Sequence, residues 1–108
     1  MEIEVADPWF SLIQKGIKTV EGRKGSPKWK ALSEGDIVIF SAHDGRRVQA
    51  RVVKVRKYET LYEFLQSELM SALPGIGTVE EGAAVYWQWW SPEEVDLFGV
   101  LAIEVQIQ

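Results

Sequence analysis

The side chains best suited to chemistry in this sequence are Lys18, Glu21 and Arg23, which fall within six consecutive positions. A lysine in a cleft can hold a phosphate or carbonyl oxygen, or act as a base when burial and a neighbouring cation lower its pKa. A glutamate can transfer a proton or accept a hydrogen bond from the exocyclic amine of a base, and an arginine can clamp a phosphate. The alternatives are a solvated Lys18 and a purely structural pair of Glu21 with Arg23.

Aromatic side chains near these charges are candidate platforms for a base. Trp9 comes just before the charged segment, and base stacking contributes about 1–3 kcal/mol; packing in the core is an equal alternative. Trp29 lies among Lys24 and Lys28, a mixture typical of proteins that bind single-stranded RNA. At least one member of a further aromatic group must reach the surface, and this group consists of Tyr86, Trp87, Trp89 and Trp90. We prefer the interpretation in which Trp87 and Trp90 are core residues and Trp89 lies along the surface.

Composition excludes several classes of protein. The 108 residues are 46% hydrophobic and 26% charged, which is typical of one globular domain, here taken as residues 1–108. No apolar run reaches the ~18 residues of a membrane span. The chain has no cysteine, and His43 is its only histidine, so we expect no disulfide, no metal site and no cofactor. The acidic N-terminus lacks the layout of a signal peptide, and we expect a cytoplasmic protein.

Charge is divided unevenly along the chain. All twelve lysines and arginines lie between Lys15 and Lys57, a segment that contains only four acids and therefore carries 12 − 4 = +8. The other twelve acids lie outside it, and +8 − 12 gives the net charge of −4. This division predicts a basic surface that faces an anion such as nucleic acid. The alternative is that neighbouring strands interleave and their charges pair.

Two predicted elements must position the charged segment. Asp7 as N-cap and Pro8 at the first helical position predict a helix over 9–15, which Gly16 ends in the left-handed conformation. A strand over 17–23 follows, and its alternation places Lys18 and Glu21 on opposite faces. For the two side chains to meet, the strand must bulge or twist, and Gly22 is the predicted place.

The remaining pattern predicts a small α+β fold. Further strands are expected over 2–5, 37–42, 46–58 and 99–107, with an Asp44-Gly45 hairpin turn. Further helices are expected from Ser26-Pro27 to 32, from Thr60 to about 72, from Thr78 to about 90, and from Ser91-Pro92. Because hairpins or short helices join the strands, we predict a barrel-like sheet of five or six mostly antiparallel strands with short peripheral helices.

These features resemble a known family, the ASCH domain of the PUA-like superfamily. The resemblance rests on Pro8-Trp9, on the segment from Gly16 to Arg23, and on Gly35-Asp36 before an apolar strand. The family signature is Gly-x-Lys-x-x-Glu-x-Arg after a short helix. The resemblance implies a PUA-like β-barrel with a cleft beside the signature strand and RNA or a modified nucleoside as ligand. Lys18, Glu21 and Arg23 would then be the catalytic set, and the ligand-binding residues would be Trp9, Thr19, Lys24, Lys28 and Trp29.

The resemblance also leaves the activity open. Some small ASCH proteins of similar length remove the acetyl group of N4-acetylcytidine with a lysine, a threonine three residues later and a distant glutamate. Lys18 matches the lysine, but Glu21 stands at the threonine position and Thr19 directly follows Lys18. Glu80 and Glu81 are the candidates for the distant glutamate. Three hypotheses therefore remain: a small hydrolase acting on a nucleoside or RNA, a non-catalytic RNA-binding module, and a protein-interaction module that uses its Trp-rich segment.

Overall fold

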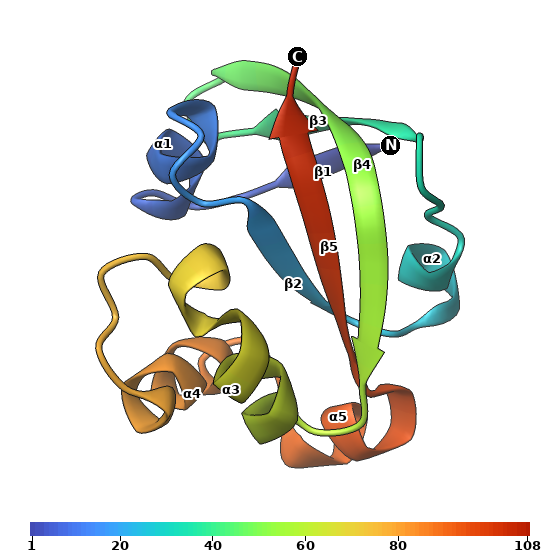
Figure 1. Cartoon of the computed structure of the whole chain (residues 1–108), viewed down its shortest axis with the longest axis vertical. Coiled ribbons are helices and arrows are strands. Elements are labelled where there is room, and N and C mark those ends of the chain that lie inside the picture. Colours follow the sequence, from blue (N-terminus) through green and yellow to red (C-terminus); the bar gives the residue numbers. More distant parts are fainter.

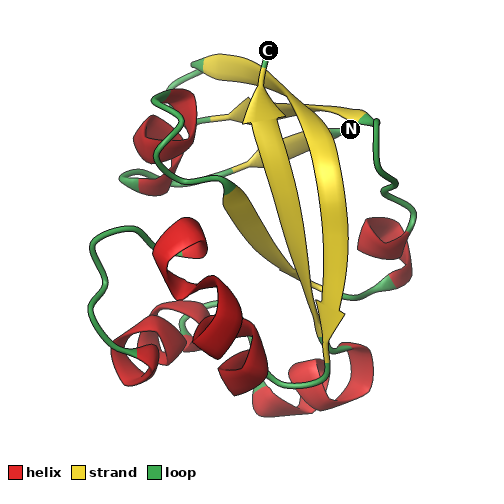
Figure 2. Cartoon of the chain, in the orientation of Figure 1, coloured by secondary structure: helices red, strands yellow, loops and turns green.

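One curled sheet forms the centre of the molecule in a computed structural model that describes residues 1–108 (Figures 1 and 2). The strand order is β1-β3-β4-β5-β2, and only the β1–β3 pair is parallel. The predicted barrel-like, mostly antiparallel sheet is thus confirmed as a half-barrel. The strands are β1 (Glu2–Glu4), β2 (Val20–Lys24), β3 (Ile37–Ser41), β4 (Arg47–Tyr58) and β5 (Val100–Ile107).

Five short helices surround this sheet, and three of them gather below it in the view of Figure 1. The side chains of Thr60, Thr78 and Ser91 accept hydrogen bonds from backbone N–H groups three residues later, as the capping signals predict. The helices are α1 (Trp9–Gln14), α2 (Pro27–Lys30), α3 (Leu61–Ala72), α4 (Val79–Trp87) and α5 (Pro92–Phe98). None is long and apolar enough to span a membrane.

The two faces of the sheet bury two separate apolar cores. The alternation along β5 shows the division: Leu101, Ile103 and Val105 belong to the core inside the curl. Val100 and Ala102 belong to the core between the sheet and the helices α3 to α5. Because both faces are covered, side chains from either face of β2 are held in a fixed environment.

The half-barrel has a seam where it does not close. β1 and β2 are the two edges of the sheet, and neither pairs with the other. The Nη2 atom of Arg23 on β2 bridges them by donating a 3.0 Å hydrogen bond to the carbonyl oxygen of Glu4 on β1. The seam is therefore closed by a side chain, which leaves room for a cavity between the edges.

The strand that carries the signature begins later than the sequence predicts. β2 starts at Val20, so Lys18 precedes the strand and needs no bulge to reach Glu21. The prediction of a bulge at Gly22 is wrong, because Gly22 pairs in regular register with Ala102. The only register shift of the sheet lies in β4, between Val52 and Lys54.

Two helix boundaries also differ from the predictions. Pro8 occupies the N-cap position of α1. Asp7 nevertheless stabilises this end, because its Oδ1 accepts hydrogen bonds from the backbone N–H (2.9 Å) and the hydroxyl (2.7 Å) of Ser11. Helix α4 ends at Trp87. Trp89 and Trp90 therefore lie in the turn after the helix, where they can face a direction that a helix would not allow.

Charge pairing removes much of the predicted basic surface. Arg46 contacts Asp7 and Asp44, and Arg56 contacts Glu68 and Glu104. Six of the twelve basic residues take part in such pairs within 4.0 Å, namely Lys18, Arg23, Lys24, Arg46, Arg47 and Arg56. The alternative interpretation, in which the charges pair, therefore describes half of the basic residues, and four of these six pair with acids from outside the basic segment: Lys24, Arg46, Arg47 and Arg56.

Candidate functional site

Lys18 is held in place by the end of α1. Gly16 adopts φ of 75°, the left-handed conformation expected after this helix. The carbonyl oxygen of Leu12 then accepts hydrogen bonds from the backbone N–H groups of both Ile17 (2.9 Å) and Lys18 (3.0 Å). This turn directs the Lys18 side chain into the protein, where it is 2% exposed.

The ammonium group of Lys18 has three acceptors around it. Its Nζ donates hydrogen bonds to the carbonyl oxygens of Val20 and Ala72, the latter at 2.6 Å, and lies 3.3 Å from Oε1 of Glu21. An ammonium group has three N–H donors, so each has a partner. Burial lowers the pKa of Lys18, Glu21 opposes that shift, and Arg23 adds to it.

Glu21 stands between two cations. Its Oε2 accepts a hydrogen bond from Nε of Arg23 (2.9 Å) and lies 2.8 Å from Nη2 in an ion pair, while Oε1 faces Lys18. The exposed fractions of the side chains rise along the row, from 2% for Lys18 to 9% for Glu21 and 27% for Arg23. Formal charges of +1, −1 and +1 leave this row with a net charge of +1. We call these three residues the charged row.

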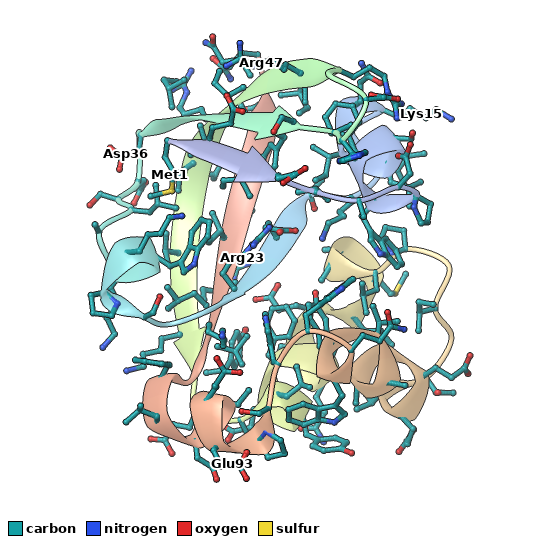
Figure 3. All side chains as sticks on the ribbon, turned by 180° about the vertical axis from the view of Figure 1, so that it is seen from behind. Met1, Lys15, Arg23, Asp36, Arg47 and Glu93 are labelled. Carbon is teal, nitrogen blue, oxygen red and sulfur yellow. The ribbon has the colours of Figure 1, made fainter.

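The charged row lines a cavity of about 270 Å³ at the seam of the half-barrel. Residues 4–6, from the last residue of β1 onward, form one side, and Gly22 of β2 forms another. Figure 3 shows Arg23 near the centre of the molecule, between the sheet edge and the helices. Pockets for drug-sized ligands measure about 300–1,000 Å³. The cavity therefore suits a ligand the size of a single base or nucleoside.

Aromatic side chains form much of the remaining wall of the cavity. Trp9 of α1 lines it, as do Tyr86, Trp89 and Trp90 from the end of α4 and the turn that follows. The rings of Tyr86 and Trp90 are stacked, with centroids 4.8 Å apart, and Trp89 meets Tyr86 edge-on. Trp89 is 54% exposed, so it forms the rim. Flat, apolar walls beside a charged row are suited to a planar ligand with polar edges.

The aromatic predictions are confirmed only in part. Trp9 packs against the two cores and also lines the cavity, so core packing is confirmed and stacking on a base stays a prediction. Trp89 is the surface residue of the C-terminal group, as preferred, but it also borders the cavity. Trp90 packs against a core and lines the cavity as well. The sequence predicts that a member of this group is exposed and could be a base platform, a dimer surface or the rim of a cleft, but nothing in it indicates that α4 ends against β2.

Four of the predicted ligand-binding residues lie outside the cavity. The backbone of Thr19 joins Ser71 of α3 to Val105 of β5, and Lys24 pairs with Glu94. Trp29 is half-buried, with the guanidinium carbon of Arg23 at 4.8 Å and Nζ of Lys28 at 4.9 Å from its ring centre. These contacts link α2 to the charged row through Arg23, but they place no α2 side chain against the cavity. The four residues are Thr19, Lys24, Lys28 and Trp29.

The remaining candidates are also distant from the cavity. Glu80 and Glu81 are exposed in the first turn of α4, where Glu81 participates in the cap at Thr78. His43 is fully exposed beside the carboxylate of Glu4. No three side chains of the types that bind metal ions cluster in the structure. The polar residues that line the cavity beside the tryptophans are therefore Glu4, Lys18, Glu21, Arg23 and Tyr86.

Comparison with known proteins identifies relatives along the whole chain. A model of the ASCH domain family matches residues 3–108. The crystal structure of the hypothetical protein PH0355 superposes with a TM-score of 0.87 at 33% identity, covering 100% of both chains. The solution NMR structure of protein PF0455 from Pyrococcus furiosus gives a TM-score of 0.75 at 32% identity, covering 99% of this chain and 97% of that one. No curated protein matches this chain.

Proposed function

Because the chain belongs to the ASCH domain family, we propose that its cavity binds one base of RNA or of a modified nucleoside. The observation that carries this proposal is the combination of stacked aromatic walls and a charged row around about 270 Å³. The aromatic rings supply stacking surfaces, and stacking contributes about 1–3 kcal/mol per base. Glu21 accepts a hydrogen bond from an exocyclic amine of the base, and Arg23 donates hydrogen bonds to carbonyl or phosphate oxygens.

Binding is tested first with the protein's own tryptophans. Trp9, Trp89 and Trp90 line the cavity, so a stacked base quenches their fluorescence. Cytidine, uridine, adenosine, guanosine, N4-acetylcytidine and a mixed-sequence single-stranded RNA are titrated separately. Saturable quenching by at least one of these supports the proposal. Linear, non-saturating responses to all six contradict it.

A matched pair of variants assigns the binding to the cavity. Trp89→Ala removes the rim and is expected to weaken binding about 5- to 150-fold, the equivalent of about 1–3 kcal/mol. Tyr62→Ala on α3 removes a comparably exposed ring, 48% against 54%, that does not line the cavity. Tyr62→Ala should bind like the wild type. Equal losses in both variants would place the ligand elsewhere.

A hydrolytic reaction is the second candidate, and it rests on Glu21. This carboxylate lines the cavity and can take a proton from a water molecule that attacks the bound ligand. Lys18 is less suited to that task, because each of its donors already has a protein partner. Chromatography of N4-acetylcytidine and RNA after incubation tests the candidate, with Glu21→Gln as control. Product that the variant does not form supports hydrolysis; intact substrates leave binding as the function.

A further inference from the structure

Tyr86 is a buried residue whose ring and hydroxyl have different surroundings. The residue is 4% exposed, its ring stacks on Trp90, and Phe64 meets it edge-on with the ring centroids 5.6 Å apart. These contacts account for an aromatic ring at position 86. They do not account for the hydroxyl, because a phenylalanine would make the same contacts.

The hydroxyl of Tyr86 forms no hydrogen bond with the protein and borders the cavity. Tyr58, which packs against the same Phe64 ring, shows the usual arrangement, since its hydroxyl donates to Glu68 at 2.7 Å. Three charged side chains are buried, and each has a partner within the protein: Lys18, Glu21 and Glu68. A buried hydroxyl without a partner is unfavourable. No buried side-chain oxygen of this protein lacks a partner, so the Tyr86 oxygen is open to the cavity, and water or a ligand there supplies its hydrogen bond.

The backbone of β2 gives this hydroxyl its space. A Cβ atom at Gly22 would lie 2.9 Å from the Tyr86 oxygen and 2.8 Å from Cζ of Phe64. Any other residue at position 22 would displace the hydroxyl from its place. Gly22 therefore leaves free the space that the Tyr86 hydroxyl occupies at the cavity wall.

The surroundings of the hydroxyl keep it protonated. Burial raises the pKa of Tyr86, and the negative charge of Glu21 raises it further. The group therefore keeps its proton and can donate it in a hydrogen bond. Glu21, which is ionised between two cations, can only accept. One donor and one acceptor consequently face the cavity near each other.

We propose that Tyr86 is a specificity-determining residue whose hydroxyl donates a hydrogen bond to a ring nitrogen or carbonyl oxygen of the bound base. This inference rests on the proposed function and deepens it. The preferred ligand carries a hydrogen-bond acceptor for Tyr86 and a donor for Glu21 on one edge of a planar ring. Nucleobases have such edges, whereas a purely hydrocarbon ring has none.

Two single-atom deletions test the inference. Tyr86→Phe keeps the ring contacts and removes only the free hydroxyl, while Tyr58→Phe removes the hydroxyl that is bonded to Glu68. Urea unfolding and fluorescence titration are measured for both, using whichever of cytidine, uridine, adenosine and guanosine binds the wild type most tightly. Tyr86→Phe is expected to bind this nucleoside about 2- to 12-fold more weakly, with an unfolding midpoint equal to or above that of the wild type. Tyr58→Phe should show the reverse: a lower midpoint and unchanged binding.

The outcomes separate the two proposals. If the wild type binds a nucleoside and Tyr86→Phe binds it equally well, the inference is overturned while the proposed function stands. A lower unfolding midpoint for Tyr86→Phe also overturns it, because the hydroxyl would then have a structural partner. If the wild type binds no nucleoside and no RNA, the proposed function fails, and the role of Tyr86 fails with it.

Discussion

Lys18 is as much a structural residue as a functional one. Its ammonium group joins the start of β2 to the last turn of α3 through the carbonyl oxygens of Val20 and Ala72, and it neutralises Glu21. A single buried cation thus connects three parts of the cavity wall. Its removal affects the shape of the site as well as its charge, so a loss of activity alone does not identify Lys18 as a catalytic residue.

This dual role predicts a large loss of stability for Lys18→Ala. The variant leaves the Glu21 carboxylate with Arg23 alone and two buried carbonyl oxygens without their donor. Breaking a buried ion pair from one side costs about 3–5 kcal/mol of unfolding free energy, and urea denaturation measures it. Lys15→Ala, an exposed lysine outside any ion pair, is the control and should stay within about 0.5 kcal/mol. A loss below about 1 kcal/mol in Lys18→Ala would show that the pair contributes little.

At the scale of elements, α1 positions two cavity residues, Trp9 directly and Lys18 through its last turn. Asp7 ties the start of this helix to the β3–β4 hairpin, because it accepts hydrogen bonds from Ser11 and from Arg46. The hydrogen bond from Arg46 is the main reason that the pKa of Asp7 falls from 3.8 to about 2, and those from Ser11 add to it.

The lowered pKa of Asp7 predicts a specific dependence of stability on pH. A carboxylate whose pKa is lower in the folded state stabilises the fold above its unfolded pKa of 3.8. That contribution is lost as the pH falls through about 2. The urea midpoint of the wild type should therefore exceed that of Asp7→Asn at pH 6, and the difference should shrink between these two pKa values. Asp96→Asn, an exposed acid of α5 outside any ion pair, is the control. A difference that persists unchanged at pH 2 would contradict the assignment.

The elements also show how far sequence reasoning extends. Local signals predicted the caps at Thr60, Thr78 and Ser91, the β3–β4 hairpin and the approximate ranges of the strands, because capping and alternation act over a few residues. The charged row was predicted because Lys18, Glu21 and Arg23 are neighbours in sequence. Tyr86 was not predicted as part of the site, because its position depends on how α4 packs against Gly22 of β2. That packing joins distant parts of the chain and leaves no local pattern.

At the scale of the whole molecule, charge pairing determines which basic side chains remain available to bind RNA. The six basic residues outside ion pairs are spread over α2, β4 and the end of α1 and are Lys15, Lys28, Lys30, Arg51, Lys54 and Lys57. None of them lines the cavity. Away from these six side chains, the net charge of −4 repels the phosphate backbone of RNA. Recognition should therefore depend on the base in the cavity more than on contacts with the backbone.

This arrangement predicts a weak dependence of RNA binding on salt. For single-stranded RNA, log K falls with log salt by about 0.7 per phosphate that the protein neutralises. With Arg23 as the main cation open to the cavity, one or two phosphates are expected, which gives a slope between about −0.7 and −1.4. Fluorescence titrations from about 50 to 200 mM salt measure it. A slope steeper than about −3 would indicate binding along the scattered lysines, and Lys28→Ala with Lys30→Ala should then reduce it.

The seam between β1 and β2 has a consequence for how the protein behaves at high concentration. Unpaired edge strands invite pairing with a second copy, and such pairing begins aggregation. Here β1 has only three residues. Arg23 donates a hydrogen bond to the carbonyl oxygen of Glu4, and Lys18 donates one to the carbonyl oxygen of Val20. An incoming strand would have to displace a buried ammonium and a guanidinium to extend the sheet. The side chains that shape the cavity therefore also protect the open edges of the fold from self-association.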